Sequence, residues 1–297
     1  GDRIMFAFSF GPFIGFWLAF ETAARLGCLC LPGGGLSSAA RLRMMRDNHA
    51  NVLCCTPTYA IRLAEVAATE KIESKTLGVK TIIVAGEPGG SIPAARAKLE
   101  SLWPGARVFD HHGMTEVGPV TFECPKQPGV LHVIESAYYA EVMDPATGQP
   151  AQSGELILTT LGRVGSPLLR YRTGDLVKLG ARPSTLDPQP CLCGRHNLAL
   201  EGGILGRVDD MVIVRGVNVY PSAVEEIIRR FSDVAEYCVH VSGAAALVEL
   251  RVEIEPSDFC RDESDLVVGV QRALETAFNL RIPVEAVAPG ALPRFEM

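Results

Sequence analysis

The sequence has no excess of positive charge, no long uninterrupted apolar run and no regular spacing of its cysteines. Its formal net charge is −6, which argues against a nucleic-acid partner but leaves room for local anion sites. The apolar stretch from Ile4 to Phe20 is broken by Gly11, Pro12 and Gly15, so we expect a buried strand and helix and no membrane partner. Nine cysteines, an odd number, favour a reducing cytoplasmic setting over a disulfide scaffold.

What is present in the first 118 positions is an alternation of apolar strands and amphipathic helices. Hydrophobic residues make up 47% of the sequence, so a packed core is expected. Strands are expected at 3–10, 28–32, 52–55, 80–85 and 107–110, and helices at 13–26, 37–46, 57–69 and 94–103. This alternation predicts a mostly parallel sheet with helices on both faces.

The pattern changes after about residue 118, where short apolar segments are separated by turn residues. Strands are expected at 130–134, 139–143, 155–159, 168–172 and 176–179. From about Arg207, the order strand, helix, strand, strand, helix predicts a compact unit. The expected fold class is α/β with α+β: a large N-terminal domain over 1–206, antiparallel from about 119, and a small C-terminal α+β domain over 207–297.

The segment Asp110 to Glu116 follows a buried strand and reads Asp-His-His-Gly-Met-Thr-Glu. A loop at the carboxyl end of a parallel strand is where α/β folds place ligands. The Thr115 hydroxyl can contact a phosphate oxygen, and the Glu116 carboxylate is the hard oxygen ligand that magnesium prefers. Taken alone, this segment is better explained as a surface turn with solvated side chains.

Two further segments carry acidic side chains beside glycine. In Tyr171-Arg172-Thr173-Gly174-Asp175, the last residue can accept hydrogen bonds from two ribose hydroxyls, although an exposed hairpin turn explains the segment equally well. In the stretch from Gly206 to Pro221, Asp209 lies at the expected domain border and Gly216 permits a close backbone approach. The alternative for that stretch is an ordinary linker.

The motifs indicate a protein family more specifically as an ordered set than any of them does alone. In order they are Gly-Met-Thr-Glu at 113–116, Gly-Glu-Leu-Ile-Leu-Thr-Thr at 154–160, Tyr-Arg-Thr-Gly-Asp at 171–175 and Gly-Arg-Val-Asp-Asp at 206–210. This set resembles the adenylate-forming superfamily of acyl-CoA ligases, luciferases and peptide-synthetase adenylation domains. The segments Gly-Glu-Pro at 86–88, Cys-Cys-Thr-Pro at 54–57, Cys-x-Cys-Gly-Arg at 191–195 and the final Leu-Pro-Arg-Phe-Glu-Met resemble the phenylacetate–CoA ligase branch.

The resemblance implies a two-step reaction with ATP, magnesium and coenzyme A. A small aromatic carboxylate would attack ATP to give acyl-AMP and pyrophosphate, and the coenzyme A thiol would then take the acyl group. Two alternatives stay open: transfer to a carrier-protein thiol, and a non-catalytic nucleotide-binding homologue. The family tendency to dimerise makes a homodimer a further expectation.

The resemblance also implies roles for individual residues. Thr115 would touch the phosphate and Glu116 would hold magnesium, while Asp175 would hold the ribose hydroxyls with Arg207 nearby. Asp209 would be the hinge between the domains, and Gly216 would lie on the pantetheine tunnel. The remaining nucleotide- and acyl-pocket positions are Gly86, Glu87, Pro88, His111, His112, Gly113 and Met114.

The sequence departs from the family at three places. The residue before Gly113 is usually a tyrosine that stacks on adenine, and here it is His112, whose ring face is smaller. The phosphate loop would precede Gly1, and the catalytic lysine would follow Met297. Because electrostatic stabilisation is often the largest catalytic contribution, the expectation is a chain truncated at both ends that adenylates poorly by itself.

Two clusters fall outside these motifs. Cys124, His132, Cys191 and Cys193 make up a ligand set typical of structural zinc, with His196 as a substitute ligand. The alternative is a pair of free thiols in a loop beside an unrelated cysteine and histidine. The aromatic residues Phe10, Phe13, Phe16 and Trp17, near three glycines at 33–35, fit either an aryl pocket or the core.

Overall fold

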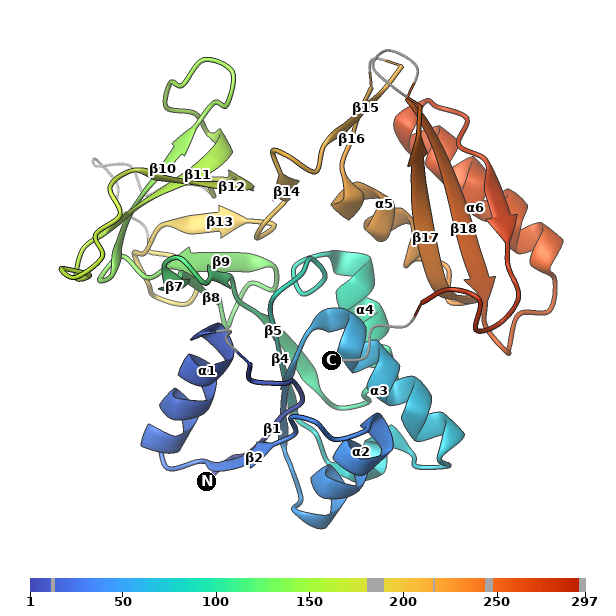
Figure 1. The fold of residues 1–297 in the computed structure, drawn as a ribbon, viewed down its shortest axis with the longest axis horizontal. Coiled ribbons are helices and arrows are strands. Elements are labelled where there is room, and N and C mark those ends of the chain that lie inside the picture. Colours follow the sequence, from blue (N-terminus) through green and yellow to red (C-terminus); the bar gives the residue numbers. More distant parts are fainter. Residues whose placement is uncertain (12–13, 181–189, 216, 244–247, 294–297) are drawn as a thin grey trace. The chain divides into compact units, whose positions relative to one another are not determined.

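A computed structural model describes residues 1–11, 14–180, 190–215, 217–243 and 248–293. The chain divides into two compact units, one from Gly1 to Val208 and the other from Asp209 to Phe295. Figure 1 shows the elements of both, and each unit is described by itself. Among the described helices, none combines the length and the apolar character that crossing a bilayer requires.

The first unit is built on a five-stranded parallel sheet in the order β2-β1-β3-β4-β5. Its strands are Arg3–Phe6 (β1), Leu29–Pro32 (β2), Val52–Cys55 (β3), Thr81–Val84 (β4) and Arg107–Asp110 (β5). The register pairs Val84 with Asp110, so β4 and β5 end side by side. Their carboxyl ends therefore open onto one edge of the sheet, where ligands bind in folds of this class.

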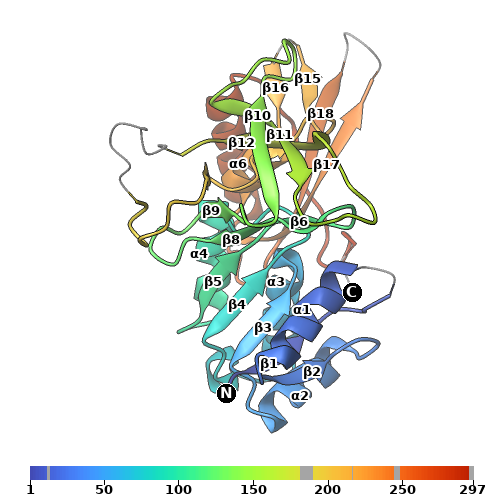
Figure 2. The same ribbon diagram turned by 90° about the vertical axis from the view of Figure 1, so that its left-hand side faces the viewer.

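Helices cover the two faces of this sheet unequally (Figures 1 and 2). Ile14–Arg25 (α1) lies on one face, and Ser38–Asp47 (α2), Pro57–Thr69 (α3) and Pro93–Leu102 (α4) lie on the other. Because successive strand side chains point to opposite faces, Ile4 and Phe6 pack in the cluster beneath α1, whereas Met5 packs in the cluster beneath α2 to α4. The predicted parallel sheet with helices on both faces is confirmed.

The helix ends follow from local sequence. The Ser37 hydroxyl accepts a hydrogen bond from the Ala40 N–H at 3.3 Å and so caps the N-terminus of α2. The Thr56 hydroxyl accepts from the Tyr59 N–H at 3.3 Å, and Pro57 fills the first position of α3, where a missing N–H costs nothing. A 3₁₀ turn, Ser74–Leu77 (η1), leads from α3 towards β4.

The rest of the first unit is antiparallel, as expected. One sheet has the order β10-β11-β12-β14, another the order β13-β9-β8, and β6 pairs with β7. The bounds are Gly113–Met114 (β6), Gly118–Pro119 (β7), Thr121–Glu123 (β8), Val130–Val133 (β9), Tyr138–Met143 (β10), Ser153–Thr160 (β11), Tyr171–Lys178 (β12), Ala199–Glu201 (β13) and Gly206–Arg207 (β14). Figure 2 shows β8 and β9 between the parallel sheet and the strands β10 to β12.

One strand prediction in this part is wrong. Two strands were expected at 168–172 and 176–179, but a single strand, β12, runs from Tyr171 to Lys178. Gly174, which looked like a turn, has a φ of +77° inside the strand, and the pairing with β11 shifts its register there. The glycine therefore makes an irregularity within a continuous strand rather than a hairpin.

The second unit is a small α+β fold, with Val212–Val214 (β15) paired to Val217–Val219 (β16). Its sheet has the order β17-β18-β19, and it carries two helices. The bounds are Pro221–Ile228 (α5), Val234–Ser242 (β17), Glu249–Pro256 (β18), Glu263–Phe278 (α6) and Val284–Ala286 (β19). The strand β19, which sequence reasoning missed, pairs in parallel with β18 and shares its core.

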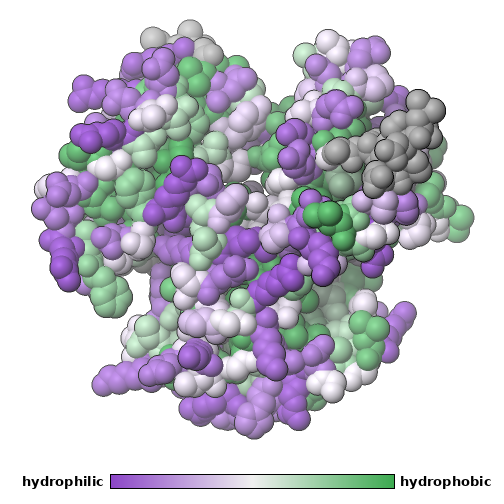
Figure 3. Space-filling view, turned by 180° about the vertical axis from the view of Figure 1, so that it is seen from behind, coloured by the Kyte–Doolittle hydropathy of each residue, from purple (hydrophilic) through white to green (hydrophobic). Residues whose placement is uncertain are grey.

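Figure 3 shows one face of the molecule coloured by hydropathy, with hydrophilic and hydrophobic residues interspersed over it. Large apolar side chains are exposed at scattered positions such as Leu26, Val164 and Phe259. Isolated exposed apolar side chains are common on globular proteins, so these positions by themselves indicate no partner.

Candidate functional site

The loop after β5 turns back on itself immediately. The His111 N–H donates to the Val84 carbonyl oxygen at 3.2 Å, which extends the pairing of β5 with β4 by one residue. Gly113 and Met114 then form β6 against β7, and a side chain on Gly113 would meet the Gly118 carbonyl oxygen at 2.9 Å. This close approach requires glycine, and it leaves the side chains of the turn that follows β6 in solvent.

Thr115 and Glu116 occupy that turn, and both are exposed. A residue far along the chain fixes the backbone of this turn, because the Arg163 guanidinium donates a hydrogen bond to the Glu116 carbonyl oxygen. The hydroxyl and the carboxylate are therefore available to a ligand.

Asp175 is delivered by β12 and is only 4% exposed. Its own N–H donates to the Thr173 hydroxyl at 3.0 Å, and the Gly174 N–H donates to the buried Glu155 carboxylate at 3.1 Å. A side chain on Gly174 would meet the Arg207 guanidinium at 2.9 Å. The positive φ and this crowding explain why glycine precedes the aspartate.

Two basic side chains face the Asp175 carboxylate. Arg207, its register partner on β14, places Nη1 3.4 Å from Oδ1. His112 places Nε2 3.1 Å from Oδ2, but without the angles of a hydrogen bond. Among the described residues, neither His112 Nε2 nor Asp175 Oδ2 has a hydrogen-bond partner, although both atoms are buried. A buried carboxylate oxygen without a donor is an acceptor ready for a ligand.

Tyr171 completes this group, although sequence reasoning gave it no role. Burial raises the pKa of its hydroxyl first, and the negative charges of Glu116 and Asp175 add to that rise, while Arg207 opposes it. The loop after β5 and the strands β12 and β14 therefore bring a hydroxyl, two carboxylates and a guanidinium together. We call His112, Glu116, Tyr171, Asp175 and Arg207 the Asp175 cluster.

The segment after β4 is adjacent to this loop because β4 and β5 end together. Gly86 is exposed with a φ of +96°, and Pro88 is exposed as well. The Glu87 carboxylate accepts hydrogen bonds from the N–H and the hydroxyl of Thr58, at 2.7 and 2.5 Å, in the first turn of α3. A carboxylate is favourable at a helix N-terminus, so Glu87 fixes this segment to α3.

A buried polar network that the sequence did not reveal lies behind the loop. The Ser91 hydroxyl donates to Asp110 at 2.5 Å, and the Asp110 N–H donates to the Glu123 carboxylate at 2.9 Å. Glu123 is paired in turn with buried Arg96. Burial, with Glu123 adding to it, raises the pKa of the Asp110 carboxyl to about 6, while Ser91 and Arg96 oppose the rise.

Burial also lowers the pKa of the neighbouring imidazole, His111. The residue at the end of β5 therefore titrates closer to neutrality than an ordinary aspartate, and the histidine after it stays neutral at physiological pH.

The remaining expected positions fall at the start of the second unit. Asp209 is exposed, in the turn after β14, and is the first residue of that unit. Its role as a hinge stays a prediction. Gly216 lies outside the described residues, and so does Phe13 of the aromatic set.

The rest of the aromatic set packs mainly against itself. Phe8 stacks on Phe16 with ring centroids 4.1 Å apart, and Phe10 contacts Trp17 at 4.8 Å. A side chain on Gly33 would meet the Phe6 carbonyl oxygen at 2.8 Å, so this glycine serves the approach of the chain to β1. Phe10 and Phe16 pack against the cluster beneath α1, which favours a core role for these two rings, whereas Trp17 is exposed.

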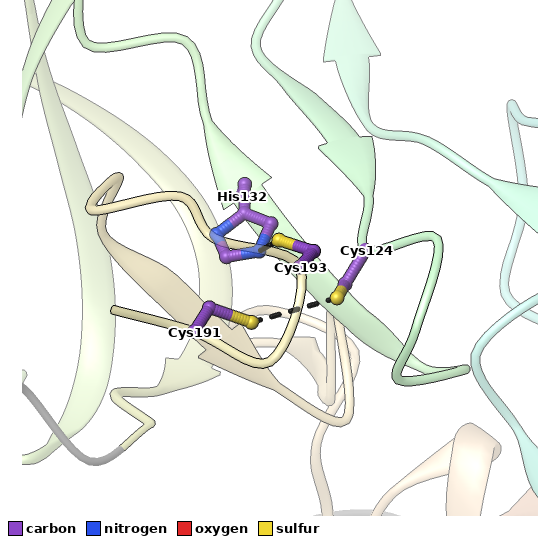
Figure 4. Close-up of side chains that lie close together, drawn as sticks. All are labelled: Cys124, His132, Cys191 and Cys193. Carbon is purple, nitrogen blue, oxygen red and sulfur yellow. Dashed lines mark hydrogen bonds between the residues drawn. The ribbon is translucent and has the colours of Figure 1, made fainter. Parts of the chain in front are cut away.

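The four expected soft ligands come together, as Figure 4 shows. The Sγ atoms of Cys124 and Cys191 are 3.5 Å apart, and Cys193 Sγ is 3.4 Å from His132 Nε2. All four ligand atoms lie within 4.8 Å of one another. His196 is exposed and is not in the group. We call these four residues the Cys/His cluster.

Comparison with known proteins gives matches over both units. Residues 2–162 match the family described as AMP-binding enzyme, and residues 216–297 match the AMP-binding enzyme C-terminal domain. A phenylacetate-coenzyme A ligase of Pseudomonas putida is 31% identical over 307 residues, which cover 100% of this chain and 67% of that protein. One of Thermus thermophilus is 31% identical over 313 residues, covering 98% and 68%. The chain spans about two thirds of the length of these curated relatives.

Solved structures give the same result. A 2-hydroxyisobutyryl-CoA ligase in the postadenylation state with 2-HIB-AMP has a TM-score of 0.90 and 29% identity, covering 100% of this chain and 64% of that chain. An anthranilate CoA ligase with anthranoyl-AMP has a TM-score of 0.69 and 17% identity, covering 100% and 57%, and at that identity it shows the fold alone.

Proposed function

The chain belongs to the AMP-binding enzyme family, that of the adenylate-forming acyl-CoA ligases, and from that premise we propose that it holds AMP through the Asp175 cluster in an acid–thiol ligase. The observation that supports this assignment is Asp175 Oδ2, a buried carboxylate oxygen that no described residue supplies with a hydrogen bond. Two vicinal ribose hydroxyls could donate to the two oxygens of this carboxylate. Arg207 Nη1 lies 3.4 Å from Oδ1 and so places an opposite charge beside the carboxylate.

The other polar groups fit the phosphate end of the nucleotide. The Thr115 hydroxyl would donate to an α-phosphate oxygen, and Glu116 would hold magnesium, which neutralises phosphate charge when bound. His112 would offer its ring to adenine. The ligand would approach the backbone at Gly86, Pro88 and Gly113. Gly86 and Pro88 are exposed, and Gly113 lies in a close turn.

The chemistry is two displacements. A carboxylate oxygen of the acid attacks the α-phosphorus of ATP, the bond to the β-phosphate oxygen breaks, and pyrophosphate leaves. The sulfur of coenzyme A, having lost its proton, then attacks the acyl carbonyl, and AMP leaves with the electrons of the carbon–oxygen bond. Residues 1–206 would hold the nucleotide for the first step, and residues 207–297, turning about Asp209 with Gly216 on the thiol path, would contribute to the second.

The acid is proposed to be an aryl or arylacetic acid, because curated relatives that align over the full chain are phenylacetate-coenzyme A ligases. A second candidate is a small branched hydroxy acid, since the 2-hydroxyisobutyryl-CoA ligase structure is almost as similar in sequence and has a TM-score of 0.90. Described aromatic rings that pack on one another, such as Phe8 and Phe16, do not favour the aryl acid over it.

The test is ATP–pyrophosphate exchange by the full-length product of the gene, with benzoate, phenylacetate and 2-hydroxyisobutyrate. Exchange with one acid and AMP release that requires coenzyme A are the expected results. Exchange without release on adding coenzyme A, but with loading of a carrier protein, would support the carrier-protein alternative. A folded protein that binds AMP yet exchanges with no acid would overturn the ligase proposal in favour of a non-catalytic homologue.

A further inference from the structure

The Cys/His cluster lies outside the proposed nucleotide site and joins two distant parts of the chain. Cys124 directly follows β8 and His132 lies within β9, whereas Cys191 and Cys193 lie in a turn about 60 residues further on, as their separations of 67 and 61 show. His132 and Cys124 are fully buried. Figure 4 shows the four side chains converging from these two segments. Apolar packing does not explain a convergence of three thiols and an imidazole.

We infer that the Cys/His cluster is a four-ligand zinc site that fastens the turn at 191–194 to the sheet of β8 and β9. Zinc prefers thiolate sulfur and imidazole nitrogen in tetrahedral geometry. With zinc–sulfur bonds of about 2.3 Å, the edges of such a tetrahedron are roughly 3.8 Å. The Cys124–Cys191 sulfur separation of 3.5 Å and the Cys193–His132 separation of 3.4 Å lie close to that edge, and no two of the four ligand atoms are more than 4.8 Å apart.

The imidazole is oriented for metal binding by a second contact. His132 Nδ1 lies 3.3 Å from the Asn197 carbonyl oxygen, which can only accept, so Nδ1 carries the proton. The lone pair of Nε2 is then free, and Nε2 faces Cys193 Sγ. A histidine that binds zinc usually donates its other N–H to such an oxygen, which fixes the tautomer.

The turn that carries the two later cysteines is closed by its own backbone. The Cys191 N–H donates to the Arg195 carbonyl oxygen at 2.8 Å, the Gly194 N–H donates to the Cys191 carbonyl oxygen at 2.6 Å, and Gly194 has a φ of +81°. The turn therefore holds the Cys191 sulfur 3.5 Å from Cys124 Sγ and the Cys193 sulfur 3.4 Å from His132 Nε2.

A disulfide is the competing explanation, and it accounts for less of the arrangement. Cys124 and Cys191 could form one if their sulfur atoms moved from 3.5 Å to about 2.05 Å. That bond would not explain why Cys193 lies beside His132 or why the tautomer of His132 is fixed. Because all four positions of a tetrahedron are filled by protein, the metal would have no open position and would be structural rather than catalytic.

The test measures metal in the purified 297-residue chain, expressed with added zinc and released by denaturation. We expect about one zinc per chain, a loss of at least roughly tenfold in Cys191→Ser and Cys193→Ser, and no change in Cys260→Ser, a thiol of the second unit that lies outside the cluster. Equal zinc content in the Cys191 and Cys260 variants, or no zinc in the wild-type chain, would overturn the proposal.

A second measurement needs no variant and so does not depend on whether a variant folds. Cobalt(II) replacing zinc should give the strong visible absorption of a tetrahedral thiolate site, and bound metal should protect the partly exposed Cys191 and Cys193 from alkylation. Peptide mapping then decides between the explanations. A Cys124–Cys191 cross-link in non-reduced chain, with no protection by metal, would show a disulfide and exclude the zinc site.

Discussion

The Asp175 cluster and the Cys/His cluster lie in the same unit, and each draws its residues from distant segments of the antiparallel region and the loop beside it. They differ in where their polar atoms point. In the Cys/His cluster, all four ligand atoms face one another within 4.8 Å. In the Asp175 cluster, Oδ2 of Asp175 has no hydrogen-bond donor among the described residues, and the neighbouring Thr115 and Glu116 side chains are exposed.

This difference separates a site that completes itself from one that needs a ligand. Four protein ligands leave a metal no free position, so the Cys/His cluster can stabilise the fold but offers no coordination site to a substrate. The Asp175 cluster keeps a buried acceptor without a hydrogen bond, which costs free energy until a ligand supplies a donor. Sites of the two kinds should therefore respond in opposite ways when their own ligand is removed.

Removal of metal should have the largest effect, and it should fall on stability. Chelation of zinc is expected to lower the free energy of unfolding of the first unit by roughly 3 kcal/mol or more, since a tightly bound ligand stabilises by mass action. Urea unfolding followed by tryptophan fluorescence reports on this unit alone, because both tryptophans, Trp17 and Trp103, lie within residues 1–208.

The comparison also predicts what chelation leaves unchanged. At a urea concentration where the unit stays folded, AMP affinity should remain within about threefold of its value with zinc, because no Cys/His ligand faces the Asp175 cluster. Cys191→Ser protein, which is expected to lack zinc already, serves as the control for effects of the chelator that do not come from removing metal. A much larger fall in AMP affinity in folded, metal-free protein would mean that the two clusters are not separate.

The second prediction concerns Asp110, whose carboxyl has its pKa raised to about 6 by burial. From about pH 4 to pH 6 the unfolded chain has lost this proton and the folded chain keeps it, so folding stability falls as pH rises. A shift of about two units corresponds to roughly 3 kcal/mol at most. Asp110→Asn should therefore gain stability relative to wild type as pH rises from about 4 to 7.

Paired urea unfolding curves at several pH values, read through Trp103, measure this difference. The asparagine oxygen can still accept from Ser91, so the network is kept while the titration is removed. Asp47→Asn, an exposed surface aspartate, is the control and should show no such trend. A constant difference between wild type and Asp110→Asn over this pH range would mean that Asp110 titrates normally.

The third prediction tests the open cluster directly. Asp175→Asn should weaken AMP binding by roughly 10- to 100-fold, because hydrogen bonds to a charged group contribute about 1.5–3 kcal/mol. Calorimetric titration of AMP into the folded variant gives the affinity, again with Asp47→Asn as the control. Unchanged affinity in Asp175→Asn would remove the ribose assignment while leaving the zinc proposal untouched.

The sequence predicted most of what hydrophobic periodicity controls. The parallel strands at 52–55 and 107–110 and the helix at 57–69 begin and end where the pattern placed them. Strand β12 failed, because Gly174 reads as a turn from local chemistry, whereas pairing with both β11 and β14 carries the strand through it. Tertiary pairing overrode the local signal there.

The clusters show the same limit. Residue types and the order of motifs pointed to Asp175 and to the four soft ligands, because each type carries its chemistry in its side chain. They did not point to Ser91 or Asn197, whose partners Asp110 and His132 are 19 and 65 residues away in the chain, or to Tyr171, which acts together with Glu116 and Arg207 from other segments. Such partners are set by the register of strands, and no spacing within the sequence encodes them.

The last prediction has the smallest effect and concerns His112, the position where the family resemblance implies a tyrosine. His112→Phe should strengthen AMP binding by about threefold, because a phenyl ring offers a larger stacking face, worth about 0.5–1 kcal/mol. It also lacks the nitrogen that lies 3.1 Å from Asp175 Oδ2, so it does not compete with the ribose for that oxygen. His112→Ala, which removes the ring altogether, should weaken binding by a similar factor. Titration of AMP into both variants gives two changes of opposite sign if adenine stacks on this residue. Two changes of the same sign would mean that His112 affects AMP binding only through Asp175. The Asp175 cluster would then contact the ribose of AMP, and adenine would not stack on His112.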